Sequence, residues 1–177
     1  AAREGLRFEP RRVWVIGDSL AGPVGNALVR LKAGLPVVVT MDTEPGTGLA
    51  SPGYFDWPAV VAERLPAVAP DVVVCMLGAN DGQALFAAGG PVEFATPEWD
   101  AAYAARVGDF MEQLAAGAGR VYWVGVPVMA GPNYDAKVRH LNRLLLFEAG
   151  LRLDVRFVAA YSLFEGEGGG FAAQLPD

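Results

Sequence analysis

Residues 13–20 read Val-Trp-Val-Ile-Gly-Asp-Ser-Leu, and this stretch decides the fold class. Four apolar residues, three of them β-branched, are followed by a glycine and by residue types that begin helices. A short apolar run bounded in this way is typical of a buried strand that turns directly into a helix. The helical segment that follows extends to about Lys32.

The same unit of an apolar run and a helical segment recurs along the chain. We expect further strands at 37–40, 72–77, 121–124 and 155–158, and helices over about 58–65, 97–115 and 134–148. This alternation indicates βαβ units and a parallel sheet covered on both faces. Right-handed crossovers then favour an α/β fold, a doubly wound, flavodoxin-like three-layer sandwich of about five strands. Residues 1–177 are expected to form a single domain.

Composition excludes several functional classes. A net charge of −6 argues against nucleic acid or an anionic membrane surface as the main partner. No apolar run approaches the roughly 20 residues that span a bilayer. Cys75 is the only cysteine and lies within an apolar run, so we expect it to be buried. It can form neither an intrachain disulfide nor a cysteine-based zinc site, and we expect no metal and no cofactor.

Functional residues are expected at one edge of the sheet. In open α/β sheets, ligands bind beyond the carboxyl ends of the strands. The candidate positions therefore lie just after Ile16, Thr40, Leu77 and Val124.

The first candidate is Gly17-Asp18-Ser19-Leu20. A serine at a strand-to-helix turn can present its hydroxyl at the edge of the sheet, and its N–H can donate to a developing oxyanion. The alternative is that Asp18 or Ser19 only caps the helix, as these residue types often do.

The second candidate is Gly78-Ala79-Asn80-Asp81. Its glycine allows a sharp turn, and the Asn80 amide could reach across to the carbonyl that Ser19 would attack. Taken alone, Asn80 and Asp81 are equally well explained as turn residues and caps. Two such segments at the ends of two strands favour a shared site.

The two segments together resemble blocks of the SGNH (GDSL-type) hydrolases. Residues 17–20 are similar to the nucleophile block, and residues 78–81 to the Gly-x-Asn-Asp block. The glycine that follows the second strand in that family is best matched by Gly48, with Gly46 as second choice. Thr-Gly-Leu at 47–49 and Phe-Asp-Trp-Pro at 55–58 resemble a bacterial branch of the superfamily.

The resemblance implies a serine esterase that acts on small acyl esters. Ser19 would be the nucleophile, and the oxyanion would be held by the Ser19 N–H, the Gly48 N–H and the Asn80 amide. Asp18 and Asp81 would support these groups. O-acetyl groups of a cell-envelope glycan are the substrate it suggests, with a periplasmic or cell-envelope location.

The base expected in this family has no match here. The family pattern requires Asp-x-x-His, which the sequence lacks, and the only histidine is His140. His140 falls off the apolar stripe of its predicted helix, beside Arg139 and Arg143, as a solvated residue would. We expect the base to lie beyond Asp177, so that this chain is incomplete at its C-terminus and inactive alone. The other hypothesis is a natural non-enzyme.

Three aromatic residues, Tyr54, Trp57 and Phe86, together with Phe55, are candidates to line an acyl or sugar pocket. They could equally pack the loops onto the sheet. Two other functions stay open: an inactive SGNH-like protein that binds an ester or glycan, and a flavodoxin-like nucleotide or flavin binder. The second explains the sheet but gives no reason for Asn80.

Overall fold

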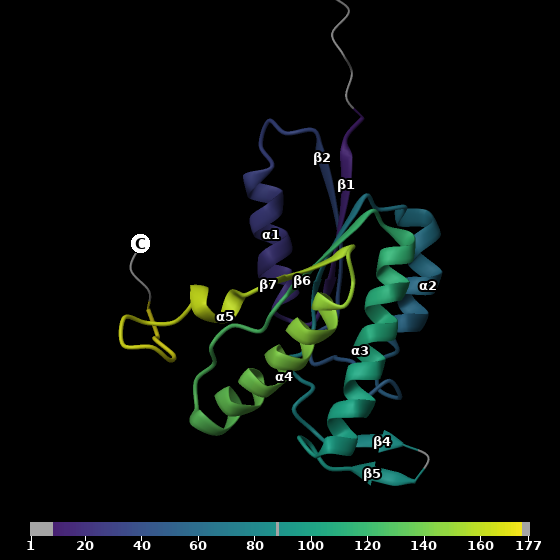
Figure 1. Ribbon diagram of the computed structural model, residues 1–177. Helices are drawn as coiled ribbons and strands as arrows, with labels where there is room; N and C mark the ends of the chain where they lie inside the picture. Colours follow the sequence, from purple (N-terminus) through teal and green to yellow (C-terminus); the bar gives the residue numbers. More distant parts are fainter. Residues whose placement is uncertain (1–8, 88, 175–177) are drawn as a thin grey trace, which may run out of the picture.

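One parallel sheet organises the molecule (Figure 1). The computed structural model describes residues 9–87 and 89–174. The strands of the sheet are β1 (Arg11–Gly17), β2 (Val37–Thr43), β3 (Val72–Met76), β6 (Arg120–Val124) and β7 (Val155–Val158). Their order is β2-β1-β3-β6-β7, and every neighbouring pair is parallel. The prediction of a doubly wound, five-stranded parallel sheet is confirmed.

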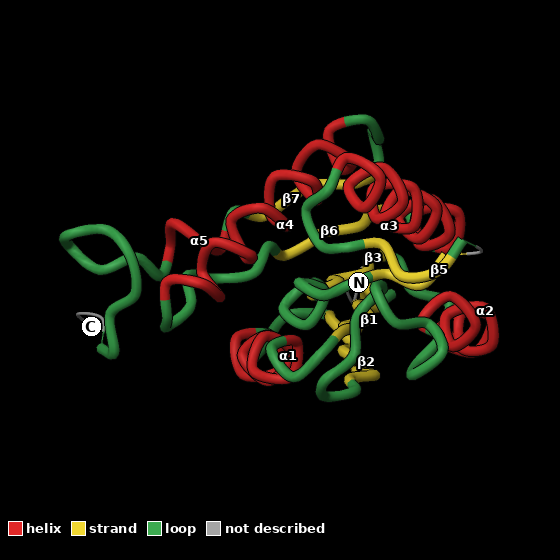
Figure 2. Tube along the Cα trace, turned by 90° about the horizontal axis from the view of Figure 1, so that it is seen from below, coloured by secondary structure: helices red, strands yellow, loops and turns green. Residues whose placement is uncertain are grey.

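Four long helices cover the sheet unequally. They are α1 (Ala21–Leu31), α2 (Trp57–Val68), α3 (Pro97–Gly117) and α4 (Pro132–Gly150). Figure 2 shows α1 and α2 on opposite sides of the sheet, and Figure 1 shows α3 and α4 together in front of it. The larger core therefore lies between the sheet and α2, α3 and α4, while α1 covers the other face.

The alternation of side chains along β1 explains this layering. Trp14 and Ile16 belong to the larger core, whereas Val13 and Val15 contact the smaller cluster under α1. Because successive side chains of a strand point to opposite faces, an apolar run without alternation can fill both cores. Cys75 is buried in the larger core, as predicted.

Local signals set the helix starts. Asp56 caps α2 by accepting a hydrogen bond from the Ala59 N–H at 3.1 Å, and Thr96 caps α3 through the Trp99 N–H at 3.2 Å. Prolines stand in the first turns of α2, α3 and α4, where a missing N–H costs nothing.

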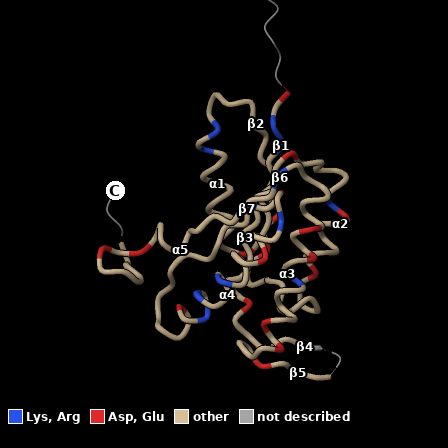
Figure 3. Tube along the Cα trace, viewed as in Figure 1, with Lys and Arg blue, Asp and Glu red and all other residues tan. Residues whose placement is uncertain are grey.

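Two small elements were not predicted. The segment between β3 and α3 contains an antiparallel hairpin, β4 (Leu85–Ala87) and β5 (Gly90–Val92), where the sequence indicated only a loop. A short helix, α5 (Ala160–Leu163), follows β7. The segment after β7 projects away from the sheet in each view (Figure 1, Figure 2 and Figure 3). No helix in the described parts is long and apolar enough to cross a membrane.

Candidate functional site

The turn after β1 places Ser19 at the edge of the sheet. Gly17 has a φ of +147°, and a Cβ there would lie 2.0 Å from the Met76 carbonyl oxygen, so only glycine fits. Asp18 then folds the chain into α1, because its Oδ1 accepts from the Leu20 N–H at 2.9 Å and its carbonyl from Ala21 at 3.1 Å. Ser19 sits at the outside of this turn and is exposed.

The turn after β3 places Asn80 at the same edge. Gly17 at the end of β1 pairs with Met76 at the end of β3, and Asp18 donates to the Met76 carbonyl at 3.1 Å. Gly78 makes the turn with a φ of +133°. The structure therefore brings the Ser19 and Asn80 segments side by side, at the carboxyl ends of the neighbouring strands β1 and β3. These strands flank the point where the chain reverses direction across the sheet, which is the ligand position expected for this topology.

The loop after β2 joins the other two through Asn80. The Asn80 amide donates to the Thr47 carbonyl at 2.9 Å, which fixes Asn80 beside Gly48. Gly48 itself is buried against Asp81, since a Cβ on it would lie 2.1 Å from Asp81 Oδ1. Gly46, the second choice from sequence, is exposed with a φ of +77°.

Asp81 and Arg106 hold this loop from two sides. The buried Asp81 carboxylate accepts from the Leu49 N–H at 3.1 Å, the Ala50 N–H at 2.8 Å and the Tyr103 hydroxyl at 2.7 Å. Arg106, one turn along α3 from Tyr103, donates to the carbonyls of Leu49 at 3.3 Å and Ala50 at 3.0 Å. Both peptide groups after Gly48 are thus fixed by α3 and the Asn80 segment.

Two buried carboxylates lie beneath the site. Burial raises the pKa of Asp18 to about 6, and the nearby Asp81 charge adds to the rise, against hydrogen bonds from Leu20 and Ala79. Burial also raises the pKa of Asp81, although its N–H and hydroxyl donors oppose the rise. Burial and the Asp81 charge raise the pKa of Tyr103 well above its usual value, so Tyr103 stays a hydrogen-bond donor.

Three donors at this edge have capacity left. Among the described residues, neither the Ser19 N–H nor the Gly48 N–H has a hydrogen-bond acceptor, and the Asn80 amide uses one of its two protons on Thr47. The Ser19 hydroxyl has no partner in the same parts of the chain. An arrangement of uncommitted donors beside a hydroxyl can stabilise negative charge that develops on a bound carbonyl.

His140 is not placed to act on Ser19. It lies on α4, where Nε2 is 2.6 Å from Asp100 Oδ1 and Nδ1 is 3.0 Å from Arg143 Nη2. Its ring packs edge-on against Phe94, with centroids 5.4 Å apart. The expectation of a solvated His140 is wrong, because these contacts leave its side chain only 19% exposed. Both ring nitrogens are therefore engaged by residues other than Ser19.

The three predicted pocket aromatics lie in different environments. Trp57 is 1% exposed, belongs to the core and donates from Nε1 to Thr47 Oγ1 at 2.9 Å. Tyr54 and Phe86 are exposed by 72% and 75%. A cavity of about 340 Å³ borders Gly48 and includes Trp57, but neither Tyr54 nor Phe86 lines it.

Sequence reasoning missed the residues of α3 that complete the site. Tyr103 binds Asp81, which lies 22 positions earlier in the sequence. Arg106 binds the carbonyls of Leu49 and Ala50, which lie 57 and 56 positions earlier. A polar residue on a predicted helix carries no sign of such a distant partner. Phe55, which the sequence did indicate as a pocket candidate, lines the cavity and packs on Trp57 with ring centroids 4.9 Å apart. The described residues contain no group of three or more His, Cys, Asp or Glu side chains that could hold a metal ion.

Comparison with known proteins gives matches of fold and of family. An α/β hydrolase from the metagenome of Lake Arreo, Spain, has a TM-score of 0.63 at 16% identity, with 88% of this chain and 79% of that chain covered. A catalytic mutant of Axe2, an acetylxylan esterase from Geobacillus stearothermophilus, has a TM-score of 0.63 at 15% identity, covering 90% and 80%. The acetyl xylan esterase Est2A from Butyrivibrio proteoclasticus has a TM-score of 0.55 at 14% identity, covering 86% and 56%.

The fold is that of SGNH-type esterases, as the sequence resemblance implied. Comparison with curated protein sequences gives no significant match. Residues 12–177 match the family described as "Protein of unknown function (DUF459)". Because the match spans nearly the whole sequence, the chain belongs to the DUF459 family.

Proposed function

We propose that this chain carries the nucleophile and the oxyanion hole of a serine ester hydrolase for small acyl esters. One observation carries the proposal. The exposed Ser19 lies at the same edge of the sheet as Asn80 and Gly48, with hydrogen-bonding capacity left on the N–H groups of Ser19 and Gly48 and on the Asn80 amide. The shared fold with acetylxylan esterases supports the same class of reaction.

In the proposed reaction, Ser19 Oγ attacks the ester carbonyl and its proton passes to a general base. The carbonyl oxygen becomes an oxyanion, which accepts from the Ser19 N–H, the Gly48 N–H and the Asn80 amide. The alcohol leaves with a proton, and water then hydrolyses the acyl-serine. Removing one donor of an oxyanion hole typically lowers the rate by about 10²- to 10³-fold.

The base is the part that this sequence does not supply. His140 is its only histidine and is bound to Asp100 and Arg143. Variants of the Axe2 esterase in which a serine, an aspartate or a histidine is replaced by alanine are described as catalytic mutants. We therefore expect the 177-residue chain alone to be weakly active or inactive, and activity to require a histidine from outside it.

The substrate we propose is a cell-envelope glycan that carries a small O-acyl group, cleaved in the periplasm or at the cell envelope. The acetylxylan esterases of the same fold act on acetylated glycans by their names, which supports this choice. The engaged His140 favours a second candidate, an SGNH-like protein that binds an acylated glycan without cleaving it.

Hydrolysis of p-nitrophenyl acetate by the natural full-length protein, with Ser19→Ala as its comparison, tests the proposal. We expect turnover by the wild type and a loss of at least about 10³-fold in Ser19→Ala. Equal rates would contradict the role of Ser19. Glycan affinity without turnover in the full-length wild type would favour the second candidate.

A further inference from the structure

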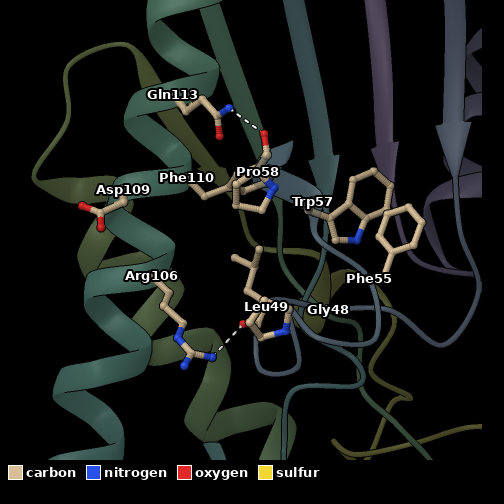
Figure 4. Close-up of a pocket in the computed structure, with 10 residues that line it drawn as sticks. Gly48, Leu49, Phe55, Trp57, Pro58, Arg106, Asp109, Phe110 and Gln113 are labelled. Atoms are coloured by element: carbon tan, nitrogen blue, oxygen red, sulfur yellow. Dashed lines mark hydrogen bonds between the residues drawn. The ribbon is translucent and has the colours of Figure 1, made fainter. Parts of the chain in front are cut away.

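A cavity adjoins the proposed oxyanion hole through Gly48 (Figure 4). It is about 340 Å³ in volume and lies between the loop after β2, the start of α2 and one face of α3. Arg106, Asp109, Phe110 and Gln113 recur at helical spacing along that face. Neither Ser19 nor Asn80 lines the cavity, so it extends away from the reacting centre on the side of Gly48.

The polar groups of this cavity are bound to each other. Arg106 donates to the carbonyls of Leu49 and Ala50 and, at 3.1 Å, to that of Phe86. Gln113 at the other end donates to the Pro58 carbonyl at 2.8 Å. The Trp57 N–H is held by Thr47. Each of these donors therefore already has a protein acceptor, a backbone carbonyl for Arg106 and Gln113 and the Thr47 hydroxyl for Trp57.

What remains for a ligand is mainly apolar. Leu49, Phe55, Trp57 and Phe110 supply aliphatic and aromatic surface, and Pro52 and Pro58 extend it. Asp109 is exposed, and Figure 4 shows its carboxylate pointing away from Phe55 and Trp57. A sugar would find few free partners here, whereas a hydrocarbon chain would bury apolar area without losing hydrogen bonds.

Size favours a chain longer than acetyl. A volume of about 340 Å³ falls at the lower end of the range for pockets that enclose whole small molecules, about 300–1,000 Å³. An acetyl group would leave most of this space unfilled. Along α3, the distance from Arg106 to Gln113 is about 10 Å, which sets the length of the cavity from the Gly48 end.

We propose that this cavity binds the acyl chain of the substrate, with room for about six to eight carbons. The inference rests on the proposed function, since it takes Gly48 as an oxyanion donor. The acyl group, unlike the alcohol, stays attached to the serine between the two half-reactions, so an apolar site beside the oxyanion suits it. The alcohol leaves after the first half-reaction and needs an open path instead.

The test is an acyl-length series of p-nitrophenyl esters, from acetate through butyrate and hexanoate to octanoate, with the natural full-length protein. We expect kcat/KM to rise at least about tenfold from acetate to hexanoate, as each buried methylene adds binding. A flat or falling profile would overturn the inference while leaving Ser19 hydrolysis intact. A preference for acetylated sugars over the octanoate ester would also overturn it.

A substitution at the far end of the cavity tests whether the acyl chain binds there. Gln113→Trp fills the end of the cavity far from Gly48, so it should lower the octanoate-to-acetate ratio of kcat/KM at least about fivefold. Ala116→Trp adds the same bulk to the exposed surface of α3 and should leave this ratio unchanged. Equal octanoate-to-acetate ratios in the two variants would show that the acyl chain does not bind in this cavity.

Calorimetry on Ser19→Ala keeps the inference testable if no ester is hydrolysed. This variant should bind p-nitrophenyl octanoate at least about tenfold more tightly than the acetate, and Gln113→Trp in the same background should abolish the difference. Binding with equal affinity for both esters would overturn the acyl-chain site independently of any activity.

Discussion

Asp18 is buried, and only part of the hydrogen-bonding capacity of its carboxylate is used. One oxygen accepts from the Leu20 N–H, while Oδ2 is buried with no partner in the described structure. A proton on this carboxyl removes the cost of a buried charge next to Asp81, which is why its pKa rises from 3.8 to about 6. Asp18 therefore links the shape of the nucleophile turn to pH.

This link predicts a pH dependence that Asp18→Asn removes. Between pH 4 and 6 the folded state binds more protons at Asp18 than the unfolded state, so stability decreases as pH rises through this window. The free energy of unfolding of the wild type, relative to Asp18→Asn, should fall by up to about 3 kcal/mol from pH 4 to pH 7. Urea titrations at several pH values measure it, and a constant difference would contradict the buried-charge explanation.

Gly48 is required because a side chain at this position would collide with Asp81. Alanine would place its Cβ 2.1 Å from Asp81 Oδ1, in a loop whose peptide groups are fixed on both sides. Gly48→Ala should lower the free energy of unfolding by about 1–3 kcal/mol through overpacking. Gly53→Ala, at an exposed glycine with nothing within 4 Å, should change it by less than about 0.5 kcal/mol. Similar values for the two variants in thermal or urea unfolding would show that the Gly48 loop yields easily.

At the scale of elements, α3 connects the site to the core. Its buried face packs on the sheet, and its N-terminal half supplies Tyr103 and Arg106 to the loop after β2. Arg106 also donates to the Phe86 carbonyl in β4, so one side chain joins a helix, a loop and the hairpin. Displacement of α3 would therefore move the loop that carries Gly48.

Arg106→Met tests this connection. It keeps the apolar stem but removes three bonds to backbone carbonyls, so the free energy of unfolding should fall by about 2–3 kcal/mol. Amide hydrogen exchange should accelerate at Leu49 and Ala50. Arg64→Met, which removes an exposed ion pair with Asp42, is the control and should cost less than about 1 kcal/mol. Unchanged exchange at Leu49 and Ala50 in Arg106→Met would mean that Asp81 alone holds the loop.

The main elements could be predicted from sequence because each carries a strong local signal. Runs such as 72–76 are apolar, unbroken and rich in valine, and α2 and α3 each have a capping residue followed by a proline in the first turn. The β4–β5 hairpin lacked such a signal, since its strands are three residues each and one contains Gly90 and Pro91. Its pairing depends on long-range support from α3, which local propensity does not encode.

The candidate site could be predicted only in part. Ser19 and Asn80 stand directly after predicted strands, so the parallel topology alone places them at one edge. The partners of Asn80 and Asp81, namely Thr47, Tyr103 and Arg106, depend on how the loops and α3 cross that edge. The roles of Ser19, Gly48 and Asn80 in catalysis remain predictions.

At the scale of the whole molecule, the order of the strands determines where chemistry can occur. The chain leaves β1 toward α1 on one face and reaches α3 from β3 on the other, so the connections that carry Ser19 and Asn80 diverge from neighbouring strand ends. The loop after β2 comes back to this edge because Asn80, Asp81 and Arg106 bind it. Three separate crossovers thereby contribute to one edge.

Covalent trapping of the nucleophile tests the role of this edge most directly. The natural full-length protein is treated with a p-nitrophenyl alkylphosphonate, which phosphonylates an activated serine, and the digested protein is examined by mass spectrometry. We expect one adduct, on the peptide that contains Ser19, and none in Ser19→Ala. An adduct on another residue, or ester hydrolysis that proceeds without labelling of Ser19, would contradict the assignment of Ser19 as the nucleophile.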